Sequence, residues 1–181
     1  MSASTTSMVT SFNLSDFNSG LTDDGVVTRI RDGQTCICTA FGNLSVPDGA
    51  TITGIEVTME GYALVGGGDH GASTGDFIYV SNDGGTSWST AKDINSGVWS
   101  TNSGAHSVET AGGVDDLWGE DWTVGAANGI QVKFTWPTSN GDAIYLDYIL
   151  MRITYTIDTG DPPTSFNRGG VSFSRGTIEI K

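Results

Sequence analysis

Two histidines are the side chains of this sequence that titrate near neutral pH at their ordinary pKa. His70 lies in the glycine-rich run 66–71, and His106 opens a short segment that follows Ser103-Gly104. General acid–base chemistry and metal binding both need partner groups at a suitable spacing, and neither histidine sits in a metal-binding spacing or a nucleophile motif. We therefore predict no catalytic residue, no cofactor-binding residue and no metal ligand, and a protein that is not an enzyme.

Clustered carboxylates offer a second kind of chemistry, because Ca²⁺ takes six to eight oxygen ligands. The clusters are Asp23-Asp24-Gly25, Asp83-Gly84-Gly85 and Asp115-Asp116. None has the ligand ladder of an EF-hand. Asp-Gly pairs are typical of turns, since glycine adopts positive φ and aspartate bonds its own backbone. We interpret all three clusters as turns; a bound glycan, a Ca²⁺ ion and a paired-carboxylate glycosidase site stay open alternatives.

One stretch carries a more specific pattern. Residues 81–88, Ser-Asn-Asp-Gly-Gly-Thr-Ser-Trp, fit the Asp-box motif Ser-x-Asp-x-Gly-x-Thr-Trp, with Ser87 in place of the threonine. The motif resembles the turns of sialidase-like propellers, in which the Asp and Ser/Thr side chains bond the turn backbone and the Trp packs beneath it. Propellers repeat it along a much longer chain, so the single copy here predicts a rigid hairpin, with the structural turn residues Ser81, Asp83, Gly85 and Trp88.

The segments that would position these residues are short and β-like. Apolar and polar residues alternate with period two in several of them, and Gly, Asp and Asn separate them, which is typical of antiparallel strands. The expected strands are 26–30, 35–41, 51–62, 77–81, 105–110, 129–136 and 144–157. Residues 115–119 are expected as one helical turn. The predicted fold is all-β, an antiparallel, jelly-roll-like β-sandwich over residues 25–157.

Two residue types should complete its core. Cys36 and Cys38 lie two apart in one predicted strand, badly placed for a disulfide, and we expect both as small buried or half-buried apolar residues. The chain also has 5 tryptophans. An exposed group of them could stack on sugars, but core or interface packing is the usual fate of tryptophan.

Charge restricts the partners. The formal net charge is −13, with 21 acidic and 8 basic residues. Such a surface repels phosphate backbones and anionic lipids, so we expect neither nucleic acid nor membrane as a partner. The first residues show no basic and apolar stretches of a secretory signal. Solubility is the simplest consequence of the charge, and a basic protein surface is the partner that it favours.

Both ends of the chain differ from the middle. Residues 1–24 are rich in Ser, Thr, Asn and Asp, and we expect an irregular N-terminal arm. Pro162-Pro163 stops strand pairing, so residues 158–181 are expected as an extended C-terminal arm. This arm holds three of the eight basic residues, and its expected partner-binding residues are Arg168, Phe173, Arg175 and Lys181. It would add a strand either to its own sheet or to a neighbouring copy.

Three stretches, taken in order, carry a family resemblance. They are VSNDGGTSW at 80–88, DLWGEDWT at 116–123 and YLDYILMRITYT at 145–156. Over residues 45–157 the chain resembles small β-sandwich virion proteins of tailed bacteriophages. The resemblance implies a jelly-roll-like fold and a structural role on the particle, without catalytic residues. It implies assembly in the host cytoplasm and localisation in the virion.

We therefore expect a capsid cement or decoration protein that binds and stabilises neighbouring capsid subunits. Its partners would be the major capsid protein or other virion proteins, and it would form a homo-oligomer. A tail or head fibre module is the nearest alternative. A carbohydrate-binding β-sandwich module is the alternative from a different class.

Overall fold

A computed structural model describes the backbone of most of the chain and, outside its first strand, the side chains as well. The described residues are 2–12, 27–31, 33–41, 44–64, 77–94, 99–136 and 143–158. The C-terminal arm, with Arg168, Phe173, Arg175 and Lys181, lies outside these residues, and so does His70.

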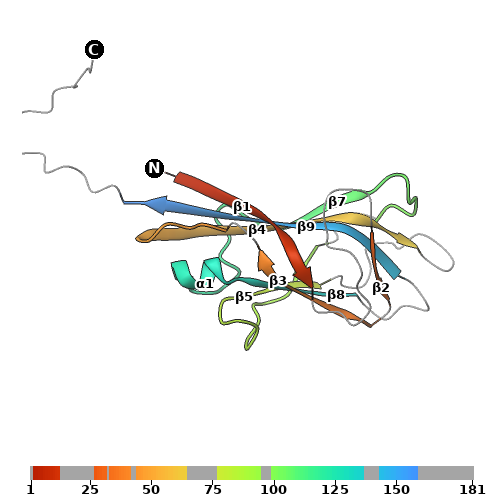
Figure 1. The fold of residues 1–181 in the computed structure, drawn as a ribbon, viewed down its shortest axis with the longest axis horizontal. Coiled ribbons are helices and arrows are strands. Elements are labelled where there is room, and N and C mark those ends of the chain that lie inside the picture. The colour runs from red at the N-terminus through yellow and green to blue at the C-terminus, as the bar shows by residue number, and fades with distance from the viewer. Residues whose placement is uncertain are drawn as a thin grey trace, which may run out of the picture.

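Within the described residues, nine strands form two antiparallel sheets that face each other (Figure 1). Sheet A contains β2, β4, β7 and β9, sheet B contains β3, β5, β6 and β8, and β1 belongs to both. The prediction of an all-β sandwich is confirmed. The strands are β1 Ser2–Phe12, β2 Thr28–Arg31, β3 Thr35–Phe41, β4 Ala50–Leu64, β5 Phe77–Ser81, β6 Lys92–Asp93, β7 Ser107–Gly113, β8 Gln131–Thr135 and β9 Ala143–Ile157.

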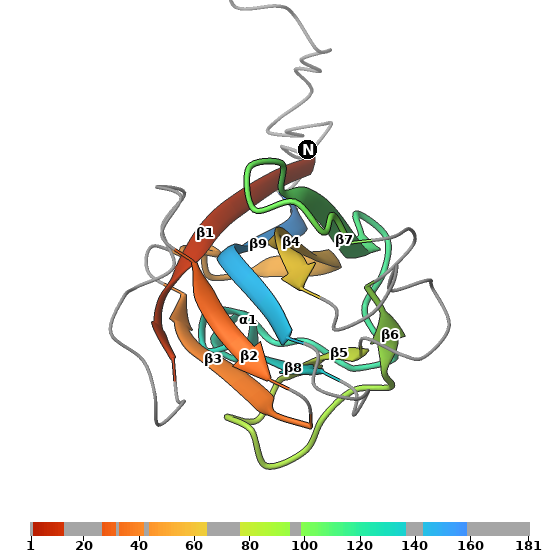
Figure 2. The same ribbon diagram turned by 90° about the vertical axis from the view of Figure 1, so that its right-hand side faces the viewer.

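Strand β1 joins the two sheets. Its first part, 2–8, pairs with β9, and its last part, 9–12, pairs with β3. The end-on view of Figure 2 shows β1 passing along one side of the sandwich from β9 to β3. The expected irregular arm over 1–24 is therefore wrong for residues 2–12. Backbone pairing with two strands holds this segment, and such pairing leaves no hydropathy pattern in a sequence that is mostly Ser and Thr.

The core lies between the sheets and comes from alternate residues of the long strands. In β4, the side chains of Ile55, Val57 and Met59 are buried together. β9 pairs with β4 on one edge and with β1 and β2 on the other, so it lies centrally in sheet A, as its long apolar run predicts. The remaining members of the core follow the same alternation, and they include Ile78, Val80, Val132, Phe134, Leu146, Ile149, Met151 and Ile153.

The cysteines and most of the tryptophans lie in this core. Cys36 and Cys38 are fully buried and free, with their sulfur atoms 3.7 Å apart. Burial, followed by the contact with Cys36, raises the pKa of the Cys38 thiol. Trp99, Trp118 and Trp136 are also buried. Both expectations for these residue types are confirmed.

One short helix and one turn differ from the sequence prediction. The helical turn expected over 115–119 is wrong, because the chain there makes two tight turns around Trp118, whose φ is +60°. The helix lies later, as α1 Val124–Asn128. Its N-cap is Thr123, whose hydroxyl accepts a hydrogen bond from the amide of Ala126.

Candidate functional site

The turn after β5 is built around one carboxylate. Asp83 Oδ1 accepts hydrogen bonds from the amides of Thr86 and Ser87, at 3.0 and 2.9 Å, and from the hydroxyl of Ser81 at 2.8 Å. Asp83 Oδ2 accepts from the Ser87 hydroxyl at 2.6 Å. The bonds to Ser87, followed by those to Ser81 and Thr86, lower the pKa of Asp83 to about 2. The carboxylate therefore serves the turn itself.

The other predicted turn residues complete the hairpin. Ser81 Oγ accepts the amide of Gly85 at 2.8 Å, and Gly85 adopts a φ of +88° that favours glycine. A side chain at Gly85 would meet Gln131 at 2.7 Å. Trp88 ends the turn, and the next residue, Ser89, donates its amide to the Val80 carbonyl of β5 at 2.9 Å. Ser81, Asp83, Gly85 and Trp88 thus lie in one turn with the bonds that the motif predicts.

An aromatic patch lies beside this turn on the outer face of sheet B. Tyr79 of β5 is directly opposite Lys133 of β8. The ammonium group of Lys133 lies 4.0 Å from the centre of the Tyr79 ring and 4.6 Å from that of Trp88. Burial lowers the pKa of Lys133. The lysine occupies a face of each ring, so a sugar that stacked there would have to displace it.

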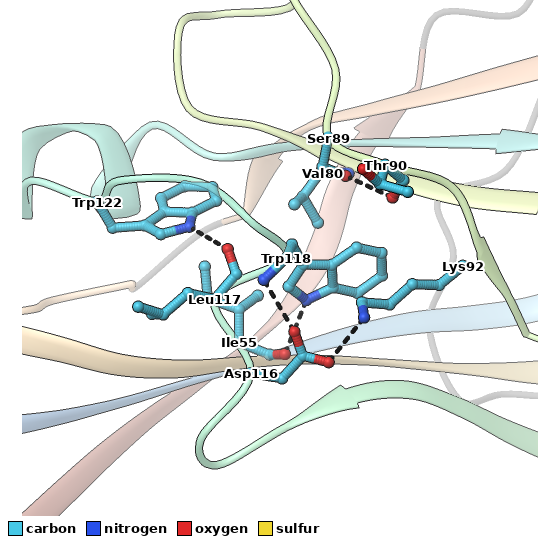
Figure 3. A network of polar contacts seen from close by, with 9 residues as sticks. All are labelled: Ile55, Val80, Ser89, Thr90, Lys92, Asp116, Leu117, Trp118 and Trp122. Atoms are coloured by element: carbon cyan, nitrogen blue, oxygen red, sulfur yellow. Dashed lines mark hydrogen bonds and ion pairs between the residues drawn. The ribbon is translucent and has the colours of Figure 1, made fainter.

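Trp118 closes the side of the sandwich where β6 approaches β7 (Figure 2). Figure 3 shows its indole directed toward β4, with Nε1 donating to the Ile55 carbonyl at 2.9 Å. Asp116 accepts from the Trp118 amide at 2.8 Å and forms an ion pair with Lys92 at 2.8 Å. Lys92 belongs to sheet B, and Asp116 follows β7 of sheet A. The contacts around Trp118 therefore connect the two sheets. The Asp116 carboxylate takes part in them through its ion pair with Lys92.

His106 lies between two carboxylates on the outer face of sheet A. Its Nδ1 atom is 3.4 Å from Glu60 Oε1 and 3.5 Å from Asp147 Oδ2. Each of the three residues offers one ligand atom, and these atoms lie within 4.8 Å of one another. The Asp147 side chain is 3% exposed, whereas Glu60 and His106 are 21% and 15% exposed. We call Glu60, His106 and Asp147 the His106 cluster.

A β-bulge brings Asp147 to this cluster. β4 and β9 pair with Glu60 opposite Tyr148 and Gly61 opposite Leu146, so Asp147 is an extra residue in the register. Without the bulge, strict alternation would place Asp147 on the same face as Ile149 and Met151, in the core. A bulge redirects a side chain in this way, and bulges are frequent beside functional sites.

Two stacked tyrosine rings lie beside the His106 cluster. Tyr62 stacks on His106 with ring centres 5.4 Å apart, and on Tyr145 with centres 4.9 Å apart. Burial, with a contribution from Tyr145, raises the pKa of Tyr62. A side chain at Gly61, between Glu60 and Tyr62, would overlap the Tyr145 carbonyl oxygen. The glycine therefore allows the close approach of β4 and β9 that brings the rings together.

The His106 cluster was missed by the sequence prediction, which named no metal ligand and found no partner for His106. Glu60, His106 and Asp147 come from three distant segments of the chain. One signal in the sequence could have indicated this site. Asp147 is an acidic residue that interrupts the apolar run of β9.

In comparisons with protein-family models, curated proteins and solved structures, no match to this chain was found. No helix in the described part of the chain has the length and hydropathy needed to cross a membrane.

Proposed function

We propose that this chain is a non-catalytic structural protein of a bacteriophage particle that binds neighbouring virion proteins, as a capsid cement or decoration protein does. The proposal rests on the resemblance of residues 45–157 to phage virion sandwiches and on one feature of the fold, the edge of β7, which pairs on one side only within the described residues. Its partners would be capsid proteins and further copies of this chain, on a particle assembled in the host cytoplasm.

Strand β7 has the properties of a docking edge. Within the described residues it pairs with β4 alone. Proteins often protect such an edge with lysine, proline, a bulge or an inward-pointing charge. β7 has the sequence SVETAGG, without lysine or proline, and its one charged residue, Glu109, is buried opposite Met59. Val108 in β7 and Val114 just after it are 55% and 50% exposed. A strand that pairs on one side only and has exposed apolar side chains is suited to accept a strand from another chain.

The C-terminal arm of a neighbouring copy is the partner strand that we propose for this edge. Residues 164–181 contain two β-like pieces, Val171-Ser172-Phe173 and Ile178-Glu179-Ile180. Residues 164–181 carry three basic residues and one acidic residue, whereas residues 1–163 carry the other five basic and 20 acidic residues. Attraction between these opposite charges would favour docking of the arm on an acidic body.

Substitution at the edge tests the docking. Val108→Lys places a charge on the edge strand itself, where lysine disfavours pairing with a further strand, and we expect it to shift the full chain from oligomer to monomer in sedimentation velocity. Leu64→Lys is the matched control, because Leu64 is 45% exposed at the end of β4 and the charge change is the same. An oligomer that survives Val108→Lys would contradict docking at β7, and a monomeric wild type would contradict exchange between copies.

The location of the chain tests the virion part of the proposal. Purified particles carrying a tagged copy should show the tag at regular capsid positions in negative-stain images. Labels confined to tails or fibres would favour the fibre alternative. Particles without label would contradict a structural role on the virion.

Glycan binding is a second candidate, favoured by the patch of Phe77, Tyr79 and Trp88. Phe77 is 40% exposed, and the two others are half-buried around Lys133. A glycan array with wild type, Tyr79→Ser and the control Leu64→Ser tests it. Binding that is lost only in Tyr79→Ser would support this candidate, and the absence of any bound glycan would count against it.

A further inference from the structure

The distances within the His106 cluster differ from those of charge-assisted hydrogen bonds. An N–H donor to a carboxylate normally lies about 2.7–2.9 Å from the oxygen. Nδ1 of His106 lies 3.4 and 3.5 Å from its two oxygens, and it can carry one proton at most. A single shared proton therefore explains the arrangement of the two carboxylates poorly.

The same distances fit ligands around a small metal ion. Zn²⁺ binds histidine nitrogen and carboxylate oxygen at about 2.0–2.2 Å, so tetrahedral ligand atoms lie roughly 3.3–3.6 Å apart. Both contacts of Nδ1 fall in this range, and all three ligand atoms lie within 4.8 Å of one another. We propose that Glu60, His106 and Asp147 form a binding site for a four-coordinate divalent transition metal ion, for which Zn²⁺ is the probe.

Charge supports a cation at this position. Glu60 and Asp147 are directed toward the same place, where Asp147 is almost completely shielded from water. Two neighbouring carboxylates repel each other, and burial strengthens this repulsion. A divalent ion between them would replace repulsion by attraction. Imidazole is a better ligand for zinc-like ions than for Ca²⁺ or Mg²⁺, which prefer oxygen donors alone.

The surrounding backbone positions the three ligands. Glu60 lies in β4, Asp147 in the bulge of β9 and His106 directly before β7, so three neighbouring strand segments each contribute one ligand. The stacked Tyr62 ring limits the orientation of the His106 imidazole. Three protein ligands leave a fourth position for water. The ion would thus connect three strands close to the bulge that interrupts their pairing.

Titration calorimetry of the full, untagged chain with Zn²⁺ tests the site. We expect binding of one ion per chain, and a higher Tm in the presence of the ion, because ligand binding stabilises the folded state. Co²⁺ should show the intense visible absorption of a four-coordinate site. Binding to the wild type no tighter than about 1 mM would overturn the proposal.

Three variants identify the ligands. Glu60→Gln and His106→Gln should each weaken Zn²⁺ binding at least tenfold and remove the Co²⁺ absorption. Glu56→Gln is the matched control, since Glu56 lies in the same strand, pairs with Arg152 and has the same 21% exposure as Glu60. Circular dichroism establishes that each variant is folded. Glu60→Gln should disturb the core least, because Glu60 is the more exposed of the two substituted ligands. Affinity unchanged in Glu60→Gln and His106→Gln, or lost equally in Glu56→Gln, would contradict the site.

Discussion

At the scale of single residues, Asp83 shows how an exposed carboxylate can organise a turn. Its two oxygens accept the amides of Thr86 and Ser87 and the hydroxyls of Ser81 and Ser87. All partners lie within four residues of Asp83. The turn therefore depends on local sequence, and it presents Trp88 to Lys133 on the outer face of sheet B.

Replacement of Asp83 by alanine should lower the Tm by roughly 2–4 °C, because the amides of Thr86 and Ser87 lose their acceptor. Thermal unfolding followed by circular dichroism measures the change. Asp121→Asn is the control, since Asp121 is an exposed carboxylate for which the structure gives no side-chain bond within this turn. Equal melting temperatures for Asp83→Ala and the wild type would show that the carboxylate does not hold the turn.

The low pKa of Asp83 predicts a dependence of stability on pH. The folded-state pKa of about 2 lies below the ordinary aspartate pKa of 3.8, so the ionised group stabilises the fold above pH about 4. This contribution is lost as the pH falls through about 2. The difference in Tm between wild type and Asp83→Asn should therefore be largest at pH 6 and should decrease toward pH 2. A difference that stays constant over this range would contradict the assignment.

At the scale of elements, the contact between β7 and β4 depends on a close approach at Gly112. This residue has a φ of +81°, and a Cβ atom there would overlap the Ile55 carbonyl oxygen and lie 2.7 Å from Trp118 Nε1. The Ile55 carbonyl is the acceptor for the indole of Trp118. The glycine therefore leaves room for the tryptophan that ties sheet A to β6 of sheet B.

Gly112→Ala should lower the free energy of unfolding by about 2–3 kcal/mol, because it combines an unfavourable φ with a steric overlap. Gly113→Ala is the matched control in the same strand, since a Cβ atom there meets nothing within 4 Å. We expect its effect to stay within about 0.5 kcal/mol. Urea unfolding of both variants measures the difference. Equal stabilities would show that the strand and the Trp118 turn can separate at little cost.

At the scale of the whole molecule, the sandwich encloses one apolar core, and the chain as a whole carries a formal net charge of −13. The described unit ends at Asp158, directly after β9. The sequence beyond it has the opposite charge balance, with three basic residues and one acidic residue between 164 and 181. Folding and partner binding should therefore depend on different parts of the chain.

A chain truncated after Asp158 should fold with a circular dichroism spectrum like that of the full chain, but should oligomerise and bind particles weakly. Binding by the full chain should weaken as salt rises, because screening reduces the attraction between arm and body. Sedimentation velocity and co-sedimentation with particles at several salt concentrations measure both effects. A truncated chain that coats particles as well as the full chain would place the contact on the sandwich instead.

The sequence alone determined those features whose causes lie within a few residues. Period-two alternation predicted most of the strands, because successive side chains of a strand point to opposite faces. In β4 this alternation appears as the shared burial of Ile55, Val57 and Met59. The turn around Asp83 followed from an eight-residue motif whose partners are all local. Cys36 and Cys38 were placed correctly for the same reason, since one strand face buries both.

Only the tertiary structure decided the features that depend on strand register and on contacts between distant segments. The insertion of β1 between β9 and β3 is made by backbone hydrogen bonds, which side-chain patterns do not encode. Trp118 adopts a positive φ because packing against Ile55 and Lys92 outweighs the local cost. The His106 cluster depends on a single extra residue in β9: the bulge turns Asp147 out of the core toward Glu60 and His106, and long-range pairing sets where that bulge occurs.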